Sequence, residues 1–234
     1  MTDTNTNDNI TPGDILACNH PSVAGREREL RALTDEVRRL IAVTVTNTAN
    51  ATDTVALTED LARVVDRIAA HVPDPVPSRL GPDRPAHGAY DGMPYDVVHG
   101  RYNPLAIPVV MHNEQPLAIG TVTFTTPYEG PPGCVHGAIL AGVFDMVLTA
   151  ANLMDDAAGP TVELKINYRK PTLLHTETRF EAWIEGREGR VTTAAGRALQ
   201  GDTVTVEAIG KFVKLKREQV MALQRRAEEQ RSGS

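Results

Sequence analysis

Hydrophobic residues recur every three or four positions in two stretches near the start of the chain, which predicts two amphipathic helices. The first begins near Ala24, and its apolar positions are Leu30, Leu33, Val37, Leu40 and Ile41. The apolar positions of the second are Leu57, Leu61, Val64, Val65 and Ile68. Between them the Thr- and Asn-rich segment 44–54 should end the first helix. Thr58 is a candidate N-cap for the second, and Pro73 should stop it. We interpret both helices as packing elements, a lid or a dimerisation element, rather than as a catalytic site.

Alternation of apolar and polar residues, which is the period of a β-strand, dominates the second half of the chain. It predicts strands over residues 117–126, 161–169, 180–184, 191–199 and 204–215. In the second of these, Val162, Leu164, Ile166 and Tyr168 are expected to share one face, and the residues between them the other. Gly201-Asp202 supplies a tight turn before the last strand. Residues 95–110 leave room for a short strand or two.

Residues 137–154 show no alternation of apolar and polar residues. Coiled into a helix, this segment would be apolar on every side. Such a helix is buried, since no face is left for water. Asp145 is the one carboxylate within it. Burying an ionised carboxylate is costly unless it is paired or hydrogen-bonded, so Asp145 is a candidate site residue, with a purely structural acid as an equal alternative. A transmembrane span is rejected, because a central Asp would cost about 2.5–3.5 kcal/mol there.

A sheet with one apolar face needs a cover, and the segment 137–154 is the one fully apolar helix that the sequence predicts. The predicted fold class is therefore α+β, with an antiparallel sheet wrapped around one long buried helix. This domain is expected over residues 95–216. A polar, disordered arm over 1–22 and a helical extension with a Pro-rich linker over 23–94 should precede it, and a charged helical tail over 217–234 should follow.

The composition is ordinary for a globular protein, with 41% hydrophobic and 23% charged residues. A net charge of −6 argues against nucleic acid or an anionic membrane surface as the main partner. Cys18 and Cys134 form neither a disulfide framework nor a metal pattern, and His87, His99 and His112 have no ligand spacing, so no metal site is expected. Cys134 is interpreted as a small buried residue in preference to a nucleophile. The N-terminus has no signal-peptide pattern, so the cytoplasm is the expected location.

Three motifs carry a resemblance to a known family. They are the turn and helix start over 130–137 (GPPGCVHG), Asp145 nine residues after His136, and the segment 161–171 (TVELKINYRKP). In this order and at this spacing they resemble the hotdog-fold thioesterase superfamily, above all its phenylacetate-pathway (PaaI-like) branch and the human thioesterase superfamily members four and five. The resemblance covers residues 117–215. It implies an acyl-CoA thioesterase that needs no separate cofactor, because coenzyme A enters as part of the substrate.

The resemblance also implies catalytic roles. Asp145 would be the general base or the nucleophile, and the backbone N–H of Gly137 would polarise the thioester carbonyl. His136 belongs to the same turn and is included among the catalytic candidates. Thr161 would orient the attacking water or the acid. Donors at a helix N-terminus suit a developing oxyanion, and a carboxylate suits proton abstraction from water.

Four further residues are assigned to the substrate by the same resemblance. Val135 and Ala138 flank the His-Gly pair, and Ala138 departs from the HGG that is usual in the family, which narrows the approach of the substrate. Gly130 is a second departure, because several relatives have an asparagine there. Arg169 and Lys170 follow the strand and are candidates for the phosphates of coenzyme A, with a solvated strand end as an equal alternative.

Gly137 and Asp145 lie eight residues apart, so ~12 Å separates them along one helix at about 1.5 Å per residue. One thioester cannot contact both groups of the same chain. Two antiparallel copies of the helix would bring Gly137 of one chain beside Asp145 of the other, which predicts a homodimer, or a dimer of dimers, with composite sites. Two alternatives stay open: a non-catalytic sensor or scaffold that binds acyl-CoA, and a hydratase or dehydratase of enoyl or hydroxyacyl thioesters that recruits His136.

Overall fold

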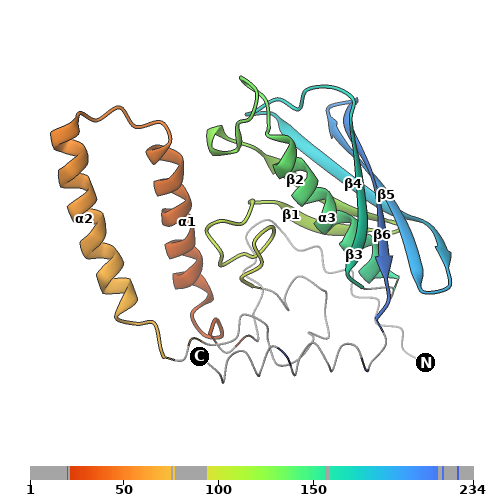
Figure 1. The fold of residues 1–234 in the computed structure, drawn as a ribbon, viewed down its shortest axis with the longest axis horizontal. Coiled ribbons are helices and arrows are strands. Elements are labelled where there is room, and N and C mark those ends of the chain that lie inside the picture. The colour runs from red at the N-terminus through yellow and green to blue at the C-terminus, as the bar shows by residue number, and fades with distance from the viewer. Residues whose placement is uncertain are drawn as a thin grey trace, which may run out of the picture.

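The computed structural model describes residues 20, 22–74, 76, 94–155, 159–215, 218 and 226. The expected disordered arm (apart from His20 and Ser22), most of the linker and nearly all of the charged tail lie outside these residues, as do Cys18 and His87. The described part consists of an N-terminal pair of helices and a sheet that curves around one long helix (Figure 1).

Six antiparallel strands form a single sheet in the order β1-β2-β4-β5-β6-β3. The strands are β1 Val110–Glu114, β2 Leu117–Thr123, β3 Thr161–Tyr168, β4 Glu177–Glu188, β5 Val191–Gln200 and β6 Thr203–Val213. Gly201-Asp202 makes the turn between β5 and β6, as predicted. The five strands predicted over residues 117–215 are thereby confirmed as β2 to β6, although β2 ends at Thr123, before the predicted residue 126, and β4 extends beyond the predicted 180–184 at both ends. At the end of the sheet, β3 pairs with β6 and leaves its other edge free of any described strand.

Helix α3 Gly137–Met154 has the predicted bounds and packs into the curve of the sheet (Figure 1). Its Phe144 meets Phe180 of β4 edge to face, with ring centroids 5.1 Å apart, and Phe180 in turn meets Phe124 at 6.3 Å. All three side chains are fully buried, and burying each contributes about 1.5–3 kcal/mol. By length and composition α3 would also suit a membrane span, but half of its residues are buried inside the fold. The α+β hotdog architecture is confirmed.

One side of α3 is less buried than the sequence indicates. Ala138 is exposed, and Ala141, Asp145 and Thr149 are partly exposed, so positions three to four residues apart form a stripe along the helix. The expectation that α3 is buried all round is therefore wrong for this side. The sheet covers only the opposite face, which carries Leu140, Val143, Phe144, Val147 and Leu148.

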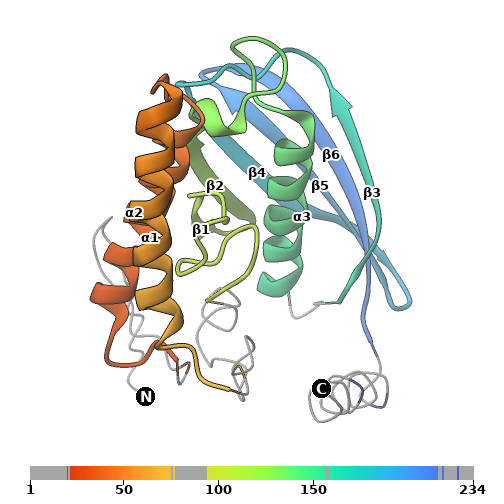
Figure 2. The ribbon, with the colours of Figure 1, turned by 60° about the vertical axis from the view of Figure 1, so that its left-hand side comes forward.

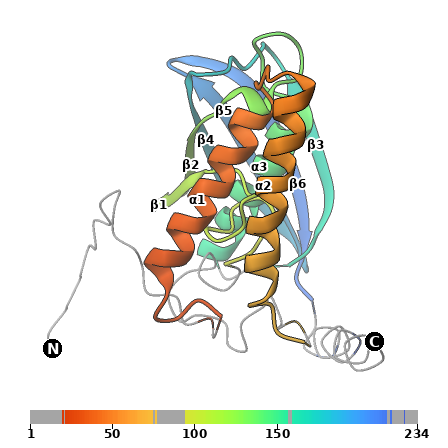
Figure 3. The ribbon, with the colours of Figure 1, turned by 90° about the vertical axis from the view of Figure 1, so that its left-hand side faces the viewer.

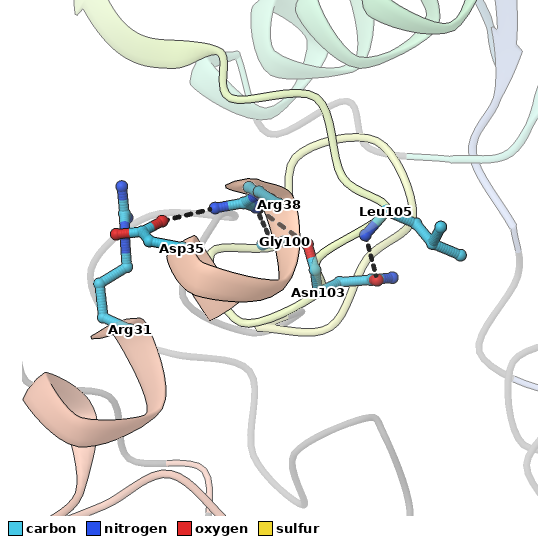
Figure 4. A network of polar contacts seen from close by, with 6 residues as sticks. All are labelled: Arg31, Asp35, Arg38, Gly100, Asn103 and Leu105. Atoms are coloured by element: carbon cyan, nitrogen blue, oxygen red, sulfur yellow. Dashed lines mark hydrogen bonds and ion pairs between the residues drawn. The ribbon is translucent and has the colours of Figure 1, made fainter. Parts of the chain in front are cut away.

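The N-terminal extension consists of α1 Glu27–Thr44 and α2 Ala51–Ala69, which lie beside the sheet on the side away from β3 (Figures 2 and 3). Helix α1 is tied to the loop before β1 by Arg38, whose guanidinium donates to the backbone oxygens of Asn103 (2.9 Å) and Gly100 (3.4 Å) (Figure 4). The same guanidinium pairs with Asp35 at 3.2 Å. In contrast, α2 has no buried residue.

Two expectations for local structure are wrong, and one strand was missed. Residues 95–109 form turns rather than strands, and β1, which starts at Val110, was not predicted. Helix α2 begins seven residues before Thr58, because the side chain of Asn50 caps it by accepting from the N–H of Asp53 at 2.9 Å. The hydroxyl of Thr58 instead donates to the backbone oxygen of Thr54 inside the helix.

Candidate active site

Asp145 on α3 and Thr161 on β3 lie in direct contact. The Thr161 hydroxyl donates a 2.6 Å hydrogen bond to Asp145 Oδ1, a length typical of a hydroxyl bound to an ionised carboxylate. Both residues are partly exposed, and Asp145 belongs to the open stripe of α3. The Asp145 carboxylate is therefore oriented by one neighbour and still open to solvent on its other oxygen.

A β-bulge directs Thr161 toward α3. The pairing of β3 with β6 shifts register between Thr161 and Glu163, so strict alternation is lost at the start of the strand. Leu164 and Ile166 pack against the core as predicted, whereas Val162 is 59% exposed. The expected grouping of Val162 with them is wrong for this reason. The bulge places the hydroxyl of Thr161, and not the methyl groups of Val162, against Asp145.

The N-terminus of α3 leaves one backbone donor free. His136 is the N-cap, and its Nδ1 accepts from the N–H of Ala138 at 3.1 Å. The N–H groups of Ile139 and Leu140 are directed to the carbonyl of His136. No hydrogen bond from the N–H of Gly137 is found among the described residues, as expected for the first position of a helix. This N–H is thus available to a ligand.

Tyr168 at the end of β3 is a site residue that the sequence argument missed. Its hydroxyl donates to the carbonyl of Gly137 at 2.8 Å, and its ring covers the helix start. A Cβ at Gly137 would lie only 2.9 Å from this hydroxyl. The sequence did place Tyr168 on the face of β3 that carries Leu164 and Ile166, but gave no reason to connect it with Gly137.

A pocket of about 440 Å³ opens beside this helix start. It is lined by Pro131, Cys134, Val135, Gly137, Leu140, Tyr168, Arg169, Lys170, Pro171 and Thr172. The fold thus brings together four residues predicted for the site, namely Val135, Gly137, Arg169 and Lys170. Ala138, His136, Asp145 and Thr161 do not line it. Cys134 does, and it is partly exposed rather than buried as expected.

The two cations at the pocket differ in their surroundings. Arg169 donates from Nε to Glu207 at 2.7 Å, so an acid already neutralises it. The ammonium group of Lys170 is exposed and has no ion pair within the described ranges. No group of three or more His, Cys, Asp or Glu side chains in the described part could hold a metal ion.

The predicted residues therefore fall into two half-sites on one chain. One is the Asp145–Thr161 pair midway along α3, and the other is the Gly137 N–H with its pocket at the helix start. Eight residues of helix, ~12 Å at 1.5 Å per residue, separate them.

Known proteins share this fold. A family model described as Thioesterase superfamily matches residues 132–207. The crystal structure of a thioesterase superfamily protein is similar over 79% of this chain and 94% of that chain, with 31% identity and a TM-score of 0.70. This chain belongs to the thioesterase superfamily. Residues 94–234 are only 141 of 234 residues, or 60%, so the match over 79% also reaches into the segment that contains α1 and α2.

More distant structures match a little under half of the chain. One is a phenylacetic acid degradation-related protein from Ralstonia eutropha, at 19% identity, 46% of this chain, 86% of that chain and a TM-score of 0.42. Another is a thioesterase protein from Streptococcus pneumoniae solved with coenzyme A, at 16% identity, 47% and 90% coverage and a TM-score of 0.43. The particular likeness to the human members four and five stays a prediction.

Proposed function

We propose that this superfamily member hydrolyses thioesters of coenzyme A or of an acyl carrier to the free acid and the thiol. The observation that carries the proposal is the Thr161–Asp145 hydrogen bond of 2.6 Å, which holds a carboxylate on the solvent-facing stripe of α3. A carboxylate that served only the core would be buried and fully satisfied. This one keeps an oxygen for a water molecule.

In the proposed reaction, Asp145 takes a proton from water while the water oxygen attacks the thioester carbonyl carbon. The carbonyl oxygen becomes an oxyanion and accepts the N–H of Gly137, which the end of the helix dipole reinforces. Collapse of the intermediate breaks the C–S bond, and the thiolate recovers the proton held by Asp145. Thr161 keeps the carboxylate in position throughout. The alternative in which Asp145 attacks the carbonyl directly uses the same contacts.

The proposed site is composite. Along one α3 the two half-sites are too far apart for one thioester, so the Gly137 pocket of one chain would work with Asp145 of a second chain. The open stripe of α3, with small side chains at Ala138 and Ala141, and the free edge of β3 support this pairing of two antiparallel helices. We therefore propose a homodimer with two equivalent sites.

Lys170 is the proposed contact for the phosphates of coenzyme A, because Arg169 is already paired with Glu207. The substitution Lys170→Met should raise KM for an acyl-CoA about 5-fold or more, as expected for loss of a charged contact. A thioester of N-acetylcysteamine has no phosphate, so its KM should not change. An equal effect on both substrates would contradict the assignment of Lys170.

The function itself is tested by thiol release from a series of acyl-CoAs, from acetyl to palmitoyl with one aryl-acyl member. Wild type and Asp145→Asn are compared, with circular dichroism and mass in solution as controls for folding and assembly. We expect turnover of at least one acyl-CoA and a loss of about 100-fold or more in the variant. Binding of acyl-CoA without turnover in the wild type would replace this proposal with the non-catalytic sensor. The hydratase alternative gains no support, because no acid of the described part pairs with His136, whose one side-chain hydrogen bond is accepted from the N–H of Ala138.

A further inference from the structure

Helix α2 exposes an apolar stripe that no described residue covers. None of its residues is buried, and even the least exposed members of the stripe, Leu61 and Ile68, are each 41% exposed. The stripe consists of Leu57, Leu61, Val64, Val65 and Ile68. At 3.6 residues per turn these side chains lie within about 60° of Leu61 around the helix axis. A contiguous apolar surface of this kind marks an interaction site.

Helix α1 adds a second set of exposed apolar residues. Its Thr34 is buried, which identifies the face that lies on the body of the protein. Leu33 and Leu40 lie about 100–120° around the helix from Thr34 and are 45% and 37% exposed. Val43 and Val45 at the end of the helix are also exposed. The pair of helices therefore presents apolar surface from both members.

The charges beside the α2 stripe favour one particular partner, a second α2 in the opposite direction. Asp53, Asp60 and Arg67 recur at every seventh residue along one flank of the stripe. If two copies pair in antiparallel fashion around the middle of α2, Asp53 of each copy comes opposite Arg67 of the other. In a parallel pair the two-fold axis runs along the helices, so the two copies of Asp53 would lie at the same height but on opposite flanks, and neither would meet Arg67. Asp60, near the centre, is already paired with Arg63 of its own chain.

We propose that α1 and α2 bind α1 and α2 of a second copy of this chain, with the two α2 helices antiparallel and Leu61 close to the two-fold axis. A stable interface buries about 800 Å² on each partner. The nine apolar side chains named above, each 37–57% exposed, would form the centre of such an interface. This contact uses none of the residues of the proposed catalytic site and lies on the side away from β3 (Figure 2). It therefore does not depend on the proposed function.

Mass in solution tests this contact. In Leu61→Glu, the dissociation constant of the helix-mediated contact should rise at least about 30-fold, and the mass at micromolar concentration should fall to half that of wild type. The matched control is Val55→Glu, since Val55 is also on α2 and 60% exposed but lies about 120° from Leu61. The control should keep the wild-type mass. Both variants should keep the circular dichroism spectrum and the thiol-release activity of wild type.

Disulfide trapping tests the antiparallel arrangement. In a background without Cys18 and Cys134, Leu61→Cys should link two chains on oxidation. Ile68→Cys should not, because antiparallel pairing about Leu61 separates it from its copy by ~20 Å. Arg67→Asp should weaken association about 2–5-fold, and adding Asp53→Arg should restore it.

Several results would overturn the proposal. One is a mass in solution that Leu61→Glu leaves unchanged. Another is a disulfide link between two chains in both Leu61→Cys and Ile68→Cys. If Leu61→Glu lowers Tm without changing the mass, segments of the same chain cover the stripe. A loss of activity in Leu61→Glu with unchanged mass would also count against it. A failed thiol-release assay would leave these measurements unaffected, so the two proposals fail separately.

Discussion

Removal of the Thr161 hydroxyl isolates the contact on which the proposed chemistry depends. Thr161→Val keeps the shape of the side chain but deletes the donor of the 2.6 Å bond to Asp145 Oδ1. A hydrogen bond to a charged group contributes about 1.5–3 kcal/mol. Asp145 is partly exposed, so water can replace part of this contact and the lower value applies. A loss of about 1.5 kcal/mol in the transition state corresponds to a kcat about 10-fold lower.

The assay is thiol release at saturating acyl-CoA, with Tm measured in parallel. Thr161→Ser keeps the hydroxyl and should retain most of the activity. Thr149→Val is a matched control on α3, the helix that carries Asp145, because the Thr149 hydroxyl donates to the backbone oxygen of Asp145 and not to its carboxylate. Its kcat should stay close to that of wild type. A Thr161→Val variant as active as wild type would refute the positioning role of Thr161.

Three further predictions concern the helix start, a loop and the core. Gly137→Pro removes the free N–H at a position where helices accept proline, so kcat should fall about 100-fold or more. Gly137→Ala keeps this N–H, so its kcat should fall far less. Burial alone would raise the pKa of Asp96, but hydrogen bonds from the His99 side chain and from the N–H groups of Val98 and His99 lower it from 3.8 to about 2. Asp96→Asn should therefore lower the free energy of unfolding, measured in urea at neutral pH, by about 1–2 kcal/mol. This difference between wild type and variant should shrink as the pH falls from ~4 toward 2, because the Asp96 carboxylate becomes protonated. A difference that grows in acid would contradict the role of Asp96. Phe180→Ala should cost about 3–5 kcal/mol in the same experiment, and a cost below ~1 kcal/mol would contradict its place in the core.

Periodicity alone predicted the central architecture, because the elements concerned are long and regular. The bounds of α3 follow from an apolar run between the turn that ends at Gly133 and the polar residues after Met154. The hairpin of β5 and β6 follows from two strand patterns on either side of the Gly201-Asp202 turn. In each case burial and local pattern agree, so no distant contact is needed to specify the element.

The errors arose where a distant or local polar contact overrides the pattern. The bulge in β3 exchanges the orientations expected for Thr161 and Val162, and pairing with β6 decides this register. The start of α2 depends on Asn50 as cap, although the apolar positions begin later. Strand β1 exists because it pairs with β2, and its own residues are mostly exposed.

The residue types of the candidate site, and the separation of Gly137 from Asp145 along one helix, were predictable, but the contacts that β3 makes with both were not. Asp145 and Gly137 are conspicuous as the lone acid and the helix start. The contact between Thr161 and Asp145 spans two elements, so the sequence could imply it only through a family resemblance. The Tyr168–Gly137 contact had no such signal, since a tyrosine at the end of a strand is equally typical of plain packing.

Mixing of two inactive variants tests the composite site most directly. Asp145→Asn lacks the carboxylate and Gly137→Pro lacks the oxyanion donor, so each alone should release little thiol from acyl-CoA. In a mixed dimer, one site would combine Gly137 of the first chain with Asp145 of the second and would be intact. After unfolding and refolding together in equal amounts, the mixture should recover roughly a quarter of wild-type activity per chain, as random pairing predicts. Activity no higher than the mean of the two separate variants, with mixed dimers demonstrated by mass, would contradict a site shared between two chains.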